Sequence, residues 1–123
     1  MNKITNINKR GSVVLITMLV LTSILTIGFG AASLIASGII MNRMRINSTV
    51  AYVAAEAGAE RSLWEVRKNN FVLPDFDQAD IFIMADLGNG ASYDVDYASS
   101  SPIVTLTANG IFKGVRRSVE LVF

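Results

Sequence analysis

The residues of this 123-residue chain that could carry chemistry are two pairs of acidic side chains. Glu56 and Glu60 are four residues apart, a spacing that places both carboxylates on one side of a helix. Such a pair can transfer protons or bind a metal, but without a further partner we interpret it as a solvated or subunit-facing edge. Asp75 and Asp77 are spaced like the first ligands of a calcium loop, but the glycine and terminal glutamate of that loop are missing. We predict no metal site.

The composition argues against catalysis more generally. The sequence contains no cysteine, which excludes disulfides, zinc ribbons and thiol chemistry, and no histidine, the commonest general base and metal ligand. Its serines and aspartates show no phosphate loop, nucleophile elbow or metal spacing. We therefore predict that the protein is not an enzyme, needs no cofactor and has no small-molecule substrate.

Residues 11–41 form one long run without a charged side chain, bounded by Arg10 and Arg43. Fifteen residues of this run are Val, Leu, Ile or Phe. About 20 helical residues cross the hydrocarbon core of a bilayer, and only a helix satisfies its own backbone there. The run is roughly twice as long as the apolar part of a signal peptide, which is about 7–15 residues. We predict a transmembrane helix over residues 12–41.

The charges on either side of this helix bear on orientation and partners. The leader, residues 1–11, carries three cations, and Arg43 and Arg45 follow the apolar run. The positive-inside rule then favours a single-pass protein of the cytoplasmic membrane with its N-terminus in the cytoplasm and its C-terminal domain outside.

Residues 42–123 hold eight basic and ten acidic side chains, a formal charge of −2. No basic patch is dense enough to suggest nucleic acid.

Residues 42–69 are predicted to continue the helix outside the membrane as an amphipathic segment. This stretch lacks proline and is rich in Ala, Glu, Arg, Leu and Lys, which are strong helix formers. Apolar residues recur in it at intervals of three to four. We predict that this stripe packs on a sheet, with Trp64 as the docking residue. The predicted packing residues are Val50, Val53, Ala57 and Trp64.

The rest of the chain indicates a small sheet. Asn69-Asn70 ends the helix, and residues 70–91 are predicted to be an acidic connector with a short strand or helical turn at 81–84. Alternating residues and short turns, including Lys113-Gly114, then favour an antiparallel meander over residues 92–123. The fold class is α+β, with a long N-terminal helix and about three antiparallel strands packed on its second half. The predicted strands are residues 92–98, 103–111 and 115–123.

Two motifs resemble type IV pilins. The junction Lys9-Arg10-Gly11-Ser12, followed at once by the apolar run, resembles a prepilin leader. The segment AYVAAEAGAERSLWEVRK strongly resembles the PilX-type minor pilins, in which Ala-Ala-Glu-Ala-Gly-x-Glu follows the membrane helix. The resemblance covers roughly residues 1–68. It implies a leader of residues 1–11, cleavage by a prepilin peptidase between Gly11 and Ser12, and N-methylation of Ser12.

One position departs from the family. Major pilins carry Glu at the fifth mature position, where this chain has Ile16. In the family, that carboxylate neutralises the N-terminal amine of a neighbouring subunit, so the resemblance implies that its absence favours a minor pilin at the filament tip.

The resemblance therefore implies a structural protein that helps initiate, cap or modify a pilus-like filament, which can extend from the cell surface. Its partners would be the membrane, the prepilin peptidase, and other pilin subunits through the N-terminal helix. Two alternatives stay open. The chain could be a single-pass, membrane-anchored extracytoplasmic binding domain outside any filament, or a type II secretion pseudopilin.

Overall fold

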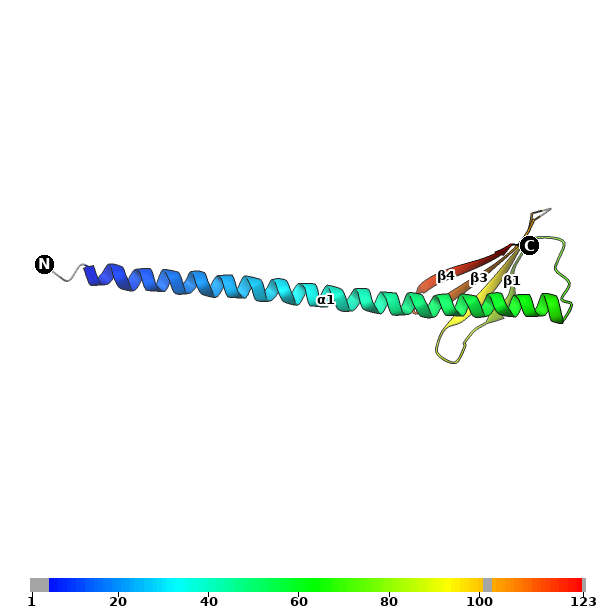
Figure 1. The fold of residues 1–123 in the computed structure, drawn as a ribbon, viewed down its shortest axis with the longest axis horizontal. Helices are drawn as coiled ribbons and strands as arrows, with labels where there is room; N and C mark the ends of the chain where they lie inside the picture. The colour runs from blue at the N-terminus through cyan, green and yellow to red at the C-terminus, as the bar shows by residue number, and fades with distance from the viewer. Residues whose placement is uncertain (1–4, 101–102, 123) are drawn as a thin grey trace. The chain divides into compact units, whose positions relative to one another are not determined.

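The computed structural model describes residues 5–100 and 103–122. One helix, α1, is followed by four strands (Figure 1). The predicted α+β fold, with a long helix and an antiparallel sheet packed on it, is confirmed. The strand count differs, because four strands are present where about three were expected. The elements are α1 (Thr5–Lys68), β1 (Gln78–Met84), β2 (Ser92–Ser100), β3 (Ile103–Phe112) and β4 (Val115–Val122).

The chain divides into two compact units, with the division after Met41. In the first unit, the side chains of residues 11–41 are all exposed. Several hydroxyl groups there donate hydrogen bonds to carbonyl oxygens one turn earlier, such as Thr22 to Met18 at 2.7 Å and Ser23 to Leu19 at 2.7 Å. These bonds satisfy polar side chains within the helix itself, as an apolar solvent requires.

The second unit, from Asn42 onwards, contains the sheet. Its strands follow the order β1-β2-β3-β4, and each neighbouring pair is antiparallel, which makes the sheet a meander. Phe112 pairs with Val115 across the predicted Lys113-Gly114 turn. Both turn residues have positive φ, 46° and 78°. Two consecutive positive φ angles are typical of the two-residue turns that match the twist of a hairpin.

Strand β1 lies inside the segment predicted as a connector, which is therefore shorter than expected. Its pairing with β2 shifts between Gln78 and Phe82, and Asp80 in this bulge has φ 56°. Beyond the bulge, Phe82, Ile83 and Met84 pair regularly with β2. The bulge breaks the alternation of apolar and polar residues, which explains why only the end of this strand was recognisable in the sequence.

The helix–sheet contact joins small residues of α1 to large residues of the sheet. The buried positions of α1 recur every three to four residues and carry only small side chains: Ala51, Ala54, Ala55, Gly58, Ala59 and Ser62. The sheet supplies the large buried side chains: Tyr93, Val95 and Tyr97 from β2, Leu106 from β3 and Phe82 from β1. Small residues on one side let the two backbones come close, so the sheet's side chains fill the space between them.

This arrangement corrects the predicted packing face. Val53 and Trp64 are 56% and 54% exposed, so neither docks the sheet. Val50 is half-buried, and Ala57 is half-buried against the core cluster. The prediction followed the largest apolar side chains, whereas the close approach of helix and sheet selects the smallest ones.

The helix ends where the sequence indicated. Asn70 has φ 53°, and the N–H of Phe71 donates to the carbonyl oxygen of Glu65 at 3.1 Å. A left-handed residue and a hydrogen bond back to the last helical turn are typical of a helix C-terminus, although this bond joins residues six positions apart, one more than in the Schellman motif. The ring of Phe71 then packs on Phe82 of β1, with centroids 4.9 Å apart. This contact ties the chain leaving the helix to the edge of the sheet.

Candidate functional site

The predicted cleavage site lies on the exposed surface of α1. Gly11 and Ser12 are both helical and exposed, and nothing lies within 4 Å of where a Cβ on Gly11 would be. Glycine lowers local helix stability by about 1 kcal/mol relative to alanine, which would ease unwinding in a peptidase. The peptide bond is accessible, but its cleavage and the methylation of Ser12 stay predictions.

The apolar run presents large side chains on all sides of the helix. Ile16, at the position where major pilins carry Glu, is 60% exposed, and Ile27 and Leu34 are 72% and 76% exposed. Within the described residues, α1 is the one helix long and apolar enough to cross a membrane. Such a surface is stable in lipid or against other apolar helices rather than in water.

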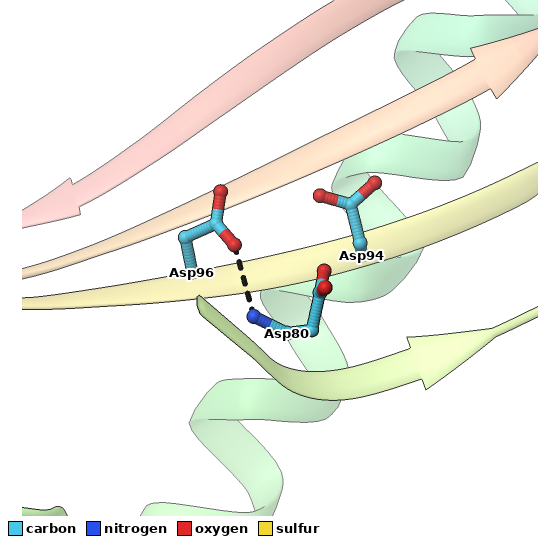
Figure 2. Close-up of side chains that lie close together, drawn as sticks. All are labelled: Asp80, Asp94 and Asp96. Carbon is cyan, nitrogen blue, oxygen red and sulfur yellow. Dashed lines mark hydrogen bonds between the residues drawn. The ribbon is translucent and has the colours of Figure 1, made fainter. Parts of the chain in front are cut away.

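Three carboxylates gather on the sheet face that points away from α1. The alternation of β2 sends Tyr93, Val95 and Tyr97 towards the helix and Asp94 and Asp96 to the opposite face. The bulge of β1 brings Asp80 beside them (Figure 2). One carboxylate oxygen from each aspartate lies within 4.8 Å of the others.

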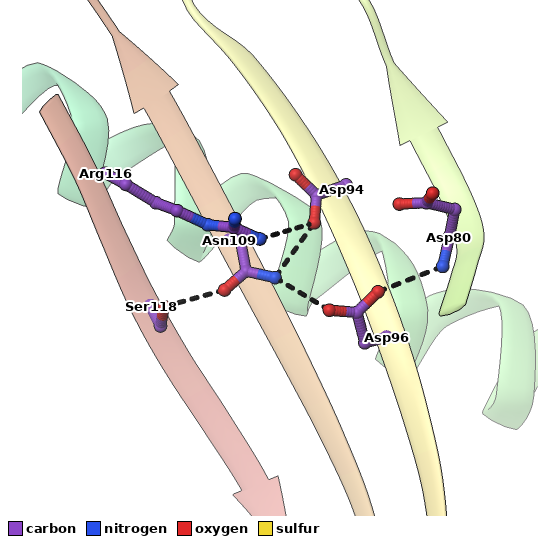
Figure 3. A network of polar contacts seen from close by, with 6 residues as sticks. All are labelled: Asp80, Asp94, Asp96, Asn109, Arg116 and Ser118. Atoms are coloured by element: carbon purple, nitrogen blue, oxygen red, sulfur yellow. Dashed lines mark hydrogen bonds and ion pairs between the residues drawn. The ribbon is translucent and has the colours of Figure 1, made fainter. Parts of the chain in front are cut away.

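Hydrogen bonds to neighbouring strands already occupy two of these carboxylates (Figure 3). The side-chain amide of Asn109 donates to Asp94 at 2.8 Å and to Asp96 at 3.0 Å. The Asp80 N–H donates to the other oxygen of Asp96 at 3.0 Å, and Arg116 pairs with Asp94 at 3.2 Å. Since these donors offset much of the negative charge, we interpret the cluster as a structural network that joins all four strands.

Asn109 is the centre of this network. It is only 4% exposed, and its carbonyl oxygen accepts a hydrogen bond from the Ser118 hydroxyl at 2.7 Å. The Asp94–Asp96 alternation was visible in the sequence, whereas the approach of Asp80 depends on a bulge with no clear sequence signal.

The acidic pairs predicted from the sequence lie outside this cluster. Asp75 is exposed, and Asp77 accepts a hydrogen bond from the Ser99 N–H at 2.6 Å.

Two polar contacts on α1 involve tyrosines. The guanidinium of Arg61 donates to the hydroxyl of Tyr93 at 3.1 Å, and this phenolic oxygen raises the pKa of Arg61. Glu56, one turn after Tyr52, raises the pKa of the Tyr52 phenol through hydrogen bonding and its negative charge. Glu60 is exposed on the same side of the helix. Neither contact places a nucleophile beside a base.

Comparisons with known proteins identify no family or function for this chain. No protein-family model, curated protein or solved structure matches this chain. A functional interpretation therefore depends on the residues and the fold themselves. Their most distinctive feature is the exposed, uncharged part of α1, residues 11–41. The later part of the same helix belongs to the small folded domain.

Proposed function

We propose that this chain is a minor pilin-like structural subunit, anchored in the cytoplasmic membrane, that helps initiate, cap or modify a filament. One observation carries the proposal: α1 is unbroken from Thr5 to Lys68, so the same helix has an uncharged apolar part and a part that holds the sheet. A subunit that passes from lipid into a helical filament needs such a helix, because both surroundings bury the apolar part.

The exposed side chains of the apolar run allow the subunit to leave lipid for a filament without exposing apolar surface to water. Burying apolar surface is worth about 25 cal/mol per Å², so side chains such as Ile27 and Leu34 gain as much among neighbouring helices as in lipid. Ile16 brings no carboxylate to neutralise another subunit's N-terminal amine. An unpaired charge in apolar surroundings costs several kcal/mol. A subunit of this kind fits the end of a filament better than its interior.

Processing at Gly11 is the sharpest test. The chain is expressed in cells with and without a prepilin peptidase, and intact-mass spectrometry determines its N-terminus. We expect a chain that begins at methylated Ser12 only when the peptidase is present. Gly11→Ala should block processing, while Gly38→Ala, in equally open surroundings, should leave it unchanged.

The opposite outcome would favour the alternative, a membrane-anchored binding domain outside any filament. A chain that keeps Met1 in cells with an active peptidase, and stays in the membrane fraction without entering filaments, would contradict the proposal. It would then be a single-pass anchor for the domain from Asn42 onwards.

A further inference from the structure

Four cations from two distant parts of the sequence meet at one end of the second unit. Arg43 and Arg45 come from α1, Lys113 from the β3–β4 turn and Arg117 from β4. We call these four residues the basic collar. Lys113 shares one surface hollow with Arg43, and Arg117 shares another with Arg45. The residues lining the two hollows are Arg43, Ile46, Asn47 and Lys113, and Met44, Arg45, Ser48, Thr49 and Arg117.

The fold holds the collar together. Gly110 of β3 packs directly on the backbone of Ala51, which brings the β3–β4 hairpin down along this part of α1. The Arg117 Nε group donates to the Ser48 hydroxyl at 2.7 Å. The two-residue turn after Phe112 then places Lys113 beside the first turns of the helix in this unit. This cluster could not be predicted from the sequence, because about 70 residues separate its two halves.

The collar cations form no salt bridge with a described residue. Among the described residues, the one salt bridge within 4.0 Å joins Arg116 to Asp94 on the outer face of the sheet. None of the four collar cations has a carboxylate that close in the part of the chain that the structure describes. The residues around them are hydroxyl, amide and apolar side chains. Their positive charge is therefore available to an external anion.

The length of the uncharged run indicates where that anion lies. The 32 residues from Gly11 to Asn42 carry no charge. At 1.5 Å per residue, a helix of this length spans about 48 Å. A bilayer with its headgroups is about 40–45 Å thick, and transmembrane helices tilt by about 20° on average. With the basic leader at one surface, Arg43 and the following two turns lie at the level of the opposite headgroups.

We propose that the basic collar binds the headgroups of anionic phospholipids and seats the folded domain on the membrane surface. The inference rests on the membrane insertion of α1 in the proposed function. The collar fits this partner because two of its cations come from α1 just after the apolar run and the other two share hollows with them. Met44 and Ile46 line the same hollows. Nucleic acid fits less well, because neither hollow is lined by an aromatic side chain, and the adjacent Phe112 ring is already covered by the Lys113 ammonium, 5.2 Å from the ring centroid.

Native mass spectrometry of the full chain tests the proposal. The protein is purified in detergent, mixed with equal amounts of phosphatidylglycerol and phosphatidylcholine, and the retained lipids are counted. We expect wild type to retain phosphatidylglycerol preferentially. Arg43→Gln/Lys113→Gln should lower that preference by about fivefold per cation removed. Arg45→Gln/Arg117→Gln should do the same, with a weaker preference at high salt.

The control removes two cations at the other end of α1. Arg67→Gln/Lys68→Gln makes the same change in net charge and should keep the wild-type preference. Because Arg117→Gln also removes a hydrogen bond to Ser48, the Arg43/Lys113 pair decides the result if the other variant unfolds. Equal retention of the two lipids by wild type, or an equal loss in the control, would overturn the proposal.

Failure of the collar and failure of the proposed function are distinguishable. If the collar does not bind lipid, wild type and collar variants still enter phosphatidylcholine vesicles through the apolar run. If the anchor itself is wrong, wild type stays out of vesicles of either composition.

Discussion

Gly110 of β3 lies directly against the backbone of Ala51 on α1. A Cβ at position 110 would collide with the carbonyl oxygen of Ala51 and the amide nitrogen of Ala55. This is the closest backbone approach of helix and sheet that a glycine makes possible here. The same contact brings the β3–β4 hairpin towards Ser48, so it supports the basic collar as well as the core.

We expect Gly110→Ala to destabilise the folded domain strongly. Its methyl group meets backbone atoms of two residues of α1, Ala51 and Ala55, and a backbone cannot rotate away as a side chain can. Overpacking of this kind typically costs about 1–3 kcal/mol, and we expect the upper end of that range. Thermal unfolding of the full chain in detergent, followed by the near-ultraviolet circular dichroism of its aromatic side chains, measures the loss.

Gly58→Ala is the matched comparison. There a Cβ would meet the Tyr93 ring at 2.9 Å and the Ala108 Cβ at 3.4 Å, and a side chain can shift where a backbone cannot. The smaller destabilisation is therefore expected at position 58. A Gly110→Ala variant as stable as wild type would show that α1 and β3 are not in backbone contact at this position.

The packing face leads to a second prediction, which contrasts Leu106 with Trp64. Leu106 is completely buried, so Leu106→Ala should cost about 2–5 kcal/mol. Trp64 is 54% exposed, so Trp64→Ala should change stability by much less, despite the larger volume removed. Quenching of the single tryptophan by acrylamide offers an independent check, since an exposed ring is quenched efficiently. Strong protection of Trp64 in the monomeric chain would contradict this placement.

The sequence identified the elements better than their contacts. The helix and its end at Asn69-Asn70 could be predicted because charge, periodicity and turn chemistry act locally. The packing face could not be inferred from apolar size, because Gly110 and the ring of Tyr93 determine which helix positions are sterically possible. Gly58 and its small neighbours carried this information, as small residues recurring every three to four positions. Only the end of strand β1, at residues 81–84, could be predicted as a short strand or helical turn, because the Asp80 bulge is stabilised from β2.

Only part of the polar network was foreseeable from the sequence. Asp94 and Asp96 alternate with buried residues, so their common face followed from strand periodicity. Their partners, Asn109 and Arg116, depend on the register of β3 and β4, in which Asn109 pairs with Asp94. Register is determined by turns and core packing across the sheet, and these were not visible in a single strand.

A third prediction concerns pH. Glu56 raises the pKa of Tyr52 above its usual value of 10.0, so Glu56→Gln should lower it. Because the folded-state pKa is the higher one, the small contribution to stability is complete below the unfolded-state pKa, near pH 10. It is lost as the pH rises through the folded-state value. Ring resonances of Tyr52, assigned with Tyr52→Phe, would follow the titration. An unchanged pKa in Glu56→Gln would show that the two side chains do not interact.

The fourth prediction tests whether the acidic cluster is a network or a latent cation site. Asn109→Asp replaces an amide that donates to both Asp94 and Asp96 with a further carboxylate in a nearly fully buried position. Losing two charge-assisted hydrogen bonds and adding repulsion should cost about 3 kcal/mol or more near neutral pH. Acidification should recover part of this loss, because protonation removes the repulsion.

Asn89→Asp makes the same charge change in the exposed β1–β2 loop and is the control. Its side-chain oxygen accepts a hydrogen bond from the Ala91 N–H at 2.9 Å, which aspartate can also accept, so stability should hardly change. Unfolding midpoints of both variants with and without calcium complete the test. If wild type itself gains several degrees with calcium, the three aspartates bind the ion and the structural interpretation is wrong. If calcium stabilises only Asn109→Asp, the amide of Asn109 is what makes the cluster a network in the natural sequence.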